Sequence, residues 1–94
     1  MKDETKFRIK VDKLLKAIPD SWFESISQRS IRGTPDKIGC INGRFIALEF
    51  KTKEKSYLSR LQDSKIKKIN KCGGYARVVY PENLNDILEE LCSL

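Results

Sequence analysis

Two carboxylates and a lysine near the middle of the chain are spaced so that they could carry out chemistry together. Asp36 precedes Glu49 by thirteen residues, and Lys51 follows that glutamate by two. Between the acids lies the pair Asn42 and Gly43, which is typical of a two-residue β-hairpin because both residues tolerate positive φ. Pairing outward from this loop places the two acids opposite each other, with the lysine diagonal to them on the same face.

Two opposed carboxylates repel, so this pairing requires a cation or a shared proton. The chain has no histidine, and its three cysteines are widely spaced, which excludes histidine-based nucleophiles and a paired-cysteine zinc site. Oxygen ligands alone favour Mg²⁺ or Mn²⁺. Lys51 could then orient or deprotonate an attacking water, or stabilise charge on a phosphoryl oxygen. The alternative interpretation is a surface salt-bridge cluster.

Glu4 and Gln62 are two further candidates, and each has two interpretations. Glu4 shares a helix face with Phe7 and Val11, so it either contributes to the metal site or is a favourable charge in a first helical turn. Gln62 completes a capping box with Ser59, which explains it structurally. The same geometry would also turn Gln62 toward the strand ends.

Periodicity and turn signals place these residues on a small α/β domain that spans residues 1–94. The predicted helices begin at residues 3, 59 and 84, and the predicted strands cover residues 22–27, 36–41, 44–51 and 75–80. Residues 44–51 and 75–80 flank a helix and should therefore be parallel neighbours. The result is a mixed sheet flanked by helices.

The hairpin register also predicts the surroundings of the acids. It puts Ile38, Cys40, Phe45 and Ala47 on the face that carries Asp36, so we expect the acids to emerge at the end of an apolar, helix-covered surface. The three cysteines are expected to be buried thiols. With no apolar run long enough to span a membrane and no signal-peptide pattern, the chain is expected in a reducing cytoplasm.

The charge distribution favours a polyanionic partner. All 19 basic residues and nine of the 13 acidic ones lie in residues 1–80, a net charge of +10, whereas residues 82–94 carry four acids and no base. This is the pattern of a phosphate-binding surface, although a solvated basic face would look the same. The bases expected to flank the site and hold DNA phosphates are Arg29, Arg32, Lys53, Lys55 and Arg60.

These residues form an ordered set with a known counterpart. Gly33-Thr34-Pro35-Asp36, followed after twelve residues by Glu49-Phe50-Lys51, resembles the signature of the PD-(D/E)XK nuclease superfamily. With Glu4, Gln62 and the Gly73-Gly74 pair before the last strand, residues 3–81 resemble the stand-alone, virus-type VRR-NUC domain.

The resemblance implies a restriction-endonuclease-like α-β-β-β-α-β core, here followed by a C-terminal helix, and a metal-dependent DNA endonuclease. Its cofactor would be Mg²⁺, with Mn²⁺ able to substitute, and no organic cofactor is expected. The implied roles are metal ligation by Asp36, Glu49 and the carbonyl of Phe50, indirect ligation by Glu4 through a water, service of the attacking water by Lys51, and support of the site by Gln62.

The resemblance also implies partners. Stand-alone members resemble Holliday-junction resolvases, so we expect a homodimer that acts on four-way junctions or other branched DNA, with no membrane association, in the host-cell cytoplasm if the gene is carried by a phage. Two alternatives stay open. One is a nuclease of another specificity, such as a flap, nick or restriction-like activity, and the other is a non-catalytic nucleic-acid-binding module on the same fold.

Overall fold

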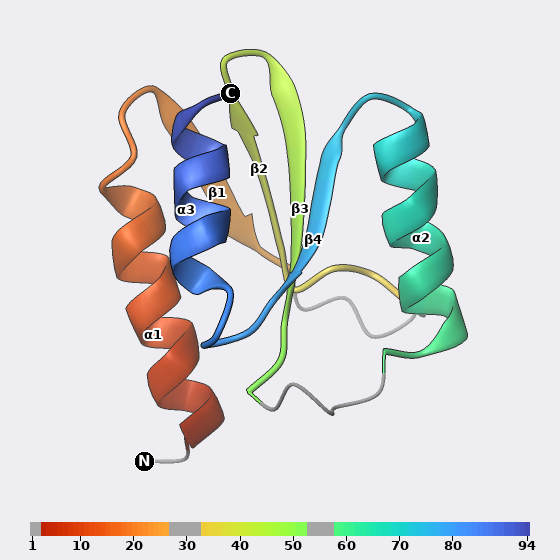
Figure 1. Cartoon of the computed structure of the whole chain (residues 1–94), viewed down its shortest axis with the longest axis horizontal. Coiled ribbons are helices and arrows are strands. Elements are labelled where there is room, and N and C mark those ends of the chain that lie inside the picture. Colours follow the sequence, from red (N-terminus) through yellow and green to blue (C-terminus); the bar gives the residue numbers. More distant parts are fainter. Residues whose placement is uncertain (1–2, 27–32, 53–57) are drawn as a thin grey trace.

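The computed structural model describes residues 3–26, 33–52 and 58–94. The elements follow in the order α1 (Asp3–Lys16), β1 (Ser21–Ser25), β2 (Lys37–Ile41), β3 (Arg44–Phe50), α2 (Arg60–Lys71), β4 (Tyr75–Val79) and α3 (Leu84–Cys92). The four strands form one sheet in the order β1-β2-β3-β4, in which only β3 and β4 are parallel. Figure 1 shows α1 and α3 on one side of the sheet and α2 on the other. The predicted mixed α/β architecture and its parallel strand pair are confirmed.

The β2–β3 hairpin has the predicted turn and the predicted register. Asn42 and Gly43 have φ angles of 52° and 82°, which the Cβ-free glycine and the short asparagine side chain tolerate. Ile41 pairs with Arg44 across the turn, as expected. The register continues without a bulge to the other end of the hairpin, where Asp36 and Glu49 lie.

The hydrophobic core lies between the sheet and the helices α1 and α3. Alternate residues of β3, among them Ile46 and Leu48, point into this layer and are fully buried. Val11 and Leu15 from α1 and Leu91 from α3 pack against them. Burying side chains of this size stabilises the fold by roughly 1.5–3 kcal/mol each. The core therefore fixes α1, the helix that carries the candidate residue Glu4, to the sheet.

The opposite face of the sheet is less covered than the sequence suggested. Trp22, Cys40 and Phe45 are neighbours across three strands, and the two aromatic residues are 53% and 46% exposed. The reason is the position of α2, which packs over β4, where Asn70 exchanges hydrogen bonds with both the backbone N–H and the carbonyl of Ala76. The predicted helix-covered surface is thus wrong for Cys40 and Phe45, whereas Ala47 on the same face is buried as expected.

The prediction of buried cysteines is also wrong, because all three are exposed. Cys40 lies on the uncovered part of the sheet, Cys72 caps the C-terminal end of α2, and Cys92 is the last residue of α3. Within the part of the chain that the structure describes, no helix is long and apolar enough to cross a membrane.

Several chain segments converge at one end of the sheet. The first turns of α1 and α2, the start of β2 and the end of β3 all lie at the lower end of the molecule in Figure 1, while the β2–β3 turn lies at the upper end. The acidic candidates Glu4, Asp36 and Glu49, together with Lys51 and Gln62, come from these four segments or from the residue next to them.

Candidate active site

Asp36 and Glu49 meet at this end of the hairpin, as the register predicts. Lys37 and Leu48 form the last pair of the ladder, and the two acids occupy the next positions. The Asp36 carboxylate is also fixed to the partner strand, because its Oδ2 accepts a hydrogen bond of 2.9 Å from the backbone N–H of Phe50. Glu49 is only 6% exposed, so one of the two acids is largely buried.

The proximity of the acids changes the chemistry of Glu49. Burial, together with the hydrogen bond to Asp36 and the negative charge of that residue, raises the pKa of Glu49 to about 8, against the opposing effect of the Lys51 and Arg8 charges. A buried glutamate in contact with another carboxylate therefore keeps a proton near neutral pH unless a cation replaces it.

Gln62 forms the predicted capping box and also contacts the acid pair. Its side-chain oxygen accepts from the backbone N–H of Ser59, and its own backbone N–H donates to the Ser59 hydroxyl, which completes the capping box at the start of α2. Its amide nitrogen donates to Glu49 Oε1 at 2.9 Å. The cap fixes the orientation of the amide, and the amide in turn holds one oxygen of the glutamate.

Arg8 is a member of this cluster that the sequence interpretation did not identify. Its Nη2 lies 3.1 Å from Oε1 of Glu4 and 3.3 Å from Oδ1 of Asp36, so the guanidinium links the first helix to the acid pair. The spacing of Glu4 and Arg8 by four residues was a sequence signal for their mutual contact. Contact with Asp36 depends on how α1 packs against the sheet, which the sequence pattern does not specify.

A small cavity of about 220 Å³ opens beside the acids. Its walls are formed by Glu4, Arg8, Glu49, Phe50, Lys51 and Thr52. Lys51 thus lies beside Glu49 in the same wall, and its backbone N–H donates to the carbonyl of Val79, which anchors it to β4. The cavity is smaller than the pockets that typically hold drug-sized ligands and suits a phosphate group with its waters.

The other residues predicted for the site are Glu4 and five basic residues, and only some of them can be placed. Glu4 reaches the cavity wall, but its side chain is 61% exposed and is paired with Arg8. Arg60 is exposed at the first residue of α2, directly after the N-cap residue Ser59. The other four bases predicted to hold phosphates, Arg29, Arg32, Lys53 and Lys55, lie outside the described residues.

The donor set fits a hard divalent cation. Two carboxylates in contact, one with a raised pKa, form a site at which a cation can replace a proton. Among the residues that the structure describes, no cluster of three acidic or cysteine side chains occurs. Mg²⁺ is commonly bound through one or two carboxylates, with waters and substrate phosphates as its other ligands. The pair therefore suits Mg²⁺ better than a cation that needs an all-protein cage.

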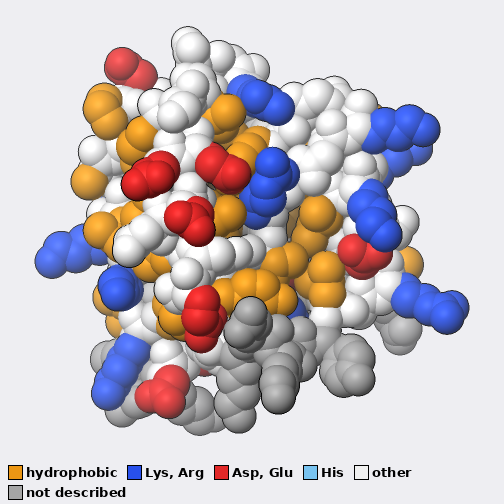
Figure 2. Space-filling view, in the orientation of Figure 1, with side chains coloured by type: hydrophobic (Ala, Val, Ile, Leu, Met, Phe, Trp, Pro, Cys, Tyr) orange, Lys and Arg blue, Asp and Glu red, His pale blue; other side chains and the backbone are white. Residues whose placement is uncertain are grey.

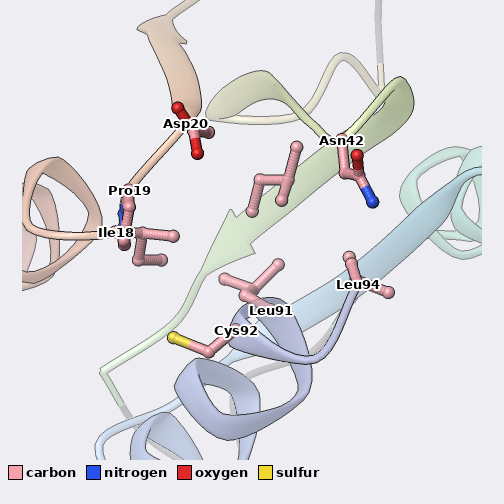
Figure 3. Close-up of a pocket in the computed structure, with 8 residues that line it drawn as sticks. Ile18, Pro19, Asp20, Asn42, Leu91, Cys92 and Leu94 are labelled. Atoms are coloured by element: carbon pink, nitrogen blue, oxygen red, sulfur yellow. The ribbon is translucent and has the colours of Figure 1, made fainter.

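A second cavity of about 510 Å³ lies at the other end of the molecule, beside the hairpin turn. Figure 3 shows the side chains around it, which come from the end of α1, the turn and the end of α3. Only one of them is acidic, Asp20, and most of the others are apolar. This cavity lacks the paired carboxylates of the candidate site.

The chain was also compared with known proteins. No protein-family model matches it, and no curated protein and no solved structure is significantly similar to it. The functional argument is therefore carried by the residues and the geometry described above.

Proposed function

We propose that the chain is a metal-dependent DNA endonuclease of the VRR-NUC type, with the restriction-endonuclease-like core of the PD-(D/E)XK superfamily. The observation that carries this proposal is the contact between Asp36 and Glu49 at the end of the hairpin, with Lys51 in the same cavity wall. The order α-β-β-β-α-β, with β3 and β4 parallel, supports the same assignment.

The chain offers a defined set of metal donors. Asp36 and Glu49 would hold Mg²⁺ or Mn²⁺ directly, the carbonyl of Phe50 would add a further ligand, and Glu4 would act through a bound water. The bound cation would supply Lewis-acid stabilisation of a phosphoryl oxygen and lower the pKa of a coordinated water. Gln62 keeps the Glu49 carboxylate oriented through its amide nitrogen, 2.9 Å from Oε1.

Lys51 is the residue proposed to serve the attacking water. Lys51 directly follows the last residue of β3, two residues after Glu49, and its charge lowers the pKa of that carboxyl and so favours its ionised form. From the cavity wall it can donate hydrogen bonds to a water or to a phosphoryl oxygen, and it can stabilise negative charge that develops during hydrolysis.

Charge supports DNA as the substrate. Residues 1–80 carry a net charge of +10, and the acidic side chains of the C-terminal segment gather over α3 (Figure 2), on the side of the sheet away from Gln62 and α2. Phosphate contacts of this kind position DNA without reading its sequence. We propose branched DNA, such as the four-way junction, as the preferred substrate and a homodimer as the active form, with two sites for two cuts.

Cleavage of labelled four-way junction, flap, plain duplex and single strand in Mg²⁺ or Mn²⁺ tests the proposal. We expect paired cuts in the junction, and a loss of about 100-fold or more in the Lys51→Ala and Glu49→Ala proteins while folding is retained. Cuts in flaps or nicked duplex instead would keep the chemistry and change the substrate. Salt-sensitive binding of every substrate without cleavage, and without Mn²⁺ binding in calorimetry, would overturn the proposal in favour of a binding module.

Oligomeric state is tested separately. Light scattering should give the mass of two chains at working concentration if one assembly presents two sites to a junction. A monomeric mass, both alone and with junction DNA, would exclude the two-site arrangement and leave the chemistry of each site in place.

A further inference from the structure

Arg8 is paired with Asp36, one of the two proposed metal ligands. Its Nη2 is shared between Glu4 Oε1 at 3.1 Å and Asp36 Oδ1 at 3.3 Å. In this state the guanidinium offsets part of the negative charge of the acid pair, which lowers the pKa of Glu49 relative to the pair alone.

The contact between Arg8 and Asp36 has the geometry of a weak ion pair. Strong arginine–carboxylate pairs are bidentate, with N···O distances of about 2.7–2.9 Å. Here one nitrogen serves two carboxylates at longer distances, while the firmer hydrogen bond to Asp36 comes from the Phe50 backbone at 2.9 Å. A dication that binds Asp36 can therefore displace the guanidinium without breaking the hydrogen bond that orients the carboxylate.

The guanidinium keeps a support and free donors when it leaves Asp36. Its central carbon lies 5.6 Å from the centroid of the Phe50 ring, a cation–π contact that does not depend on the carboxylates. Among the described residues, neither its Nε nor its Nη1 donates a hydrogen bond, and the side chain is 38% exposed. Arg8 is one of the residues that line the cavity, together with Lys51 and Thr52.

We infer that Arg8 is a phosphate-binding residue that Glu4 and Asp36 hold in reserve until a divalent cation takes its place. The inference rests on the proposed function. Cation binding at Asp36 and Glu49 repels the guanidinium from the acid pair and leaves it facing the cavity, where a DNA phosphate neutralises it with a bidentate contact. DNA phosphate and cation then bind cooperatively, because each removes a charge penalty created by the other.

This coupling is measurable without catalysis. Mn²⁺ affinity is determined by calorimetry in a Lys51→Ala background, with and without duplex DNA, for Arg8 and for Arg8→Gln. With Arg8 present, we expect DNA to tighten Mn²⁺ binding by about 5-fold or more, and Mn²⁺ to tighten DNA binding by the same factor. In the Arg8→Gln protein, Mn²⁺ alone should bind more tightly than with Arg8, and the effect of DNA should fall below about twofold.

Two controls separate this role from structure and from net charge. Lys10→Gln removes one positive charge from an exposed position of the same helix and should leave both affinities and their coupling unchanged. Arg8→Lys keeps the charge without the planar fork. In the absence of DNA it should therefore bind Mn²⁺ less tightly than Arg8→Gln does, but it should lose most of the coupling between Mn²⁺ and DNA. The Arg8→Lys comparison decides the question if Arg8→Gln proves unstable in thermal melting.

The possible results are distinguishable. Weaker Mn²⁺ binding by Arg8→Gln without DNA, or coupling that persists in both Arg8 variants, would overturn the role of Arg8 while the metal site stands. If Mn²⁺ binding to the Arg8-containing protein does not depend on Glu49, the proposed function itself fails, and the inference about Arg8 fails with it.

Discussion

At the scale of single residues, Glu49 is the group whose charge state links folding to chemistry. It is buried, its Oε1 is held by Gln62, and contact with Asp36 opposes its ionisation. In the unfolded chain the same side chain titrates near 4.5, whereas in the folded protein its pKa is about 8. The metal-free fold therefore holds a proton that the unfolded chain releases.

Glu49 makes the stability of the metal-free protein depend on pH. Between pH 4.5 and 8 the folded state binds more protons at Glu49 than the unfolded state, so this residue makes the metal-free protein less stable as pH rises through that range. Glu49→Gln removes the effect and keeps the shape of the side chain. We expect it to raise the free energy of unfolding by roughly 2–4 kcal/mol at pH 8, the larger figure for the full shift and the smaller one for partial screening by solvent, and to leave it nearly unchanged at pH 4.5.

Thermal and urea unfolding in EDTA at both pH values measure this difference. Glu24→Gln, an exposed glutamate on β1, is the matched control and should show little change at either pH. An equal gain in stability at pH 4.5 and pH 8 for Glu49→Gln would show that the effect is not electrostatic and would contradict the raised pKa.

At the scale of elements, the start of α2 joins helix capping to the geometry of the site. The capping box between Ser59 and Gln62 fixes the first turn of the helix, and the Gln62 amide that completes the box also donates to Glu49. Loosening this turn would therefore affect both the stability of α2 and the position of a proposed metal ligand.

Two variants separate these effects. Ser59→Ala removes the hydroxyl cap and should cost about 1 kcal/mol of stability, with little loss of Mn²⁺ affinity because the Gln62 amide still reaches Glu49. Gln62→Ala removes both contacts and should lower Mn²⁺ affinity by about 10-fold or more in addition to the stability loss. Calorimetry and urea unfolding of both proteins give the comparison. Equal Mn²⁺ affinities in the two variants would confine Gln62 to a capping role.

The elements differ in how well the sequence predicts them. The hairpin and the capping box were predicted correctly because each is set by a few adjacent residues, such as the positive φ of Asn42 and Gly43. Local turn geometry also fixed which acids face each other. The sequence could therefore predict the acid pair at the core of the candidate site, although the catalytic and metal-binding roles of its members stay predictions.

What the sequence missed depends on how separate elements pack. Arg8 reaches Asp36 only because α1 packs along one face of the sheet, and an arginine in an amphipathic helix has no local feature that marks this contact. The uncovered row of Trp22, Cys40 and Phe45 likewise follows from α2 packing over β4 instead of over the middle of the sheet. A period-two pattern predicts which residues share a face, but not which part of that face a helix covers.

At the scale of the whole molecule, the candidate site occupies one end of the sheet. The longest extent of the protein is 33 Å, close to one turn of B-DNA, so a single chain can contact about one turn of duplex. The end of β3, where the acid pair lies, and the first turn of α2 lie at the lower end in Figure 1, while the C-terminal end of α2 lies at the upper end. DNA bound for cleavage should therefore contact basic residues at one end of this helix and not at the other.

Arg60 and Lys71 test this polarity because they are the first and last residues of the same helix, about 16 Å apart along its axis, and both are exposed. Each substitution by glutamine removes one positive charge, so a uniform effect of net charge would weaken DNA binding equally in both. If DNA lies over the candidate site, Arg60→Gln should lose one phosphate contact and reduce the slope of log affinity against log salt by about 0.9, whereas Lys71→Gln should leave the slope within error of the parent protein. Fluorescence anisotropy with a labelled junction between about 50 and 200 mM salt gives both slopes. Equal reductions in the two variants would mean that DNA is attracted by overall charge alone, and a larger reduction for Lys71→Gln would place the DNA at the end of the molecule remote from Asp36 and Glu49.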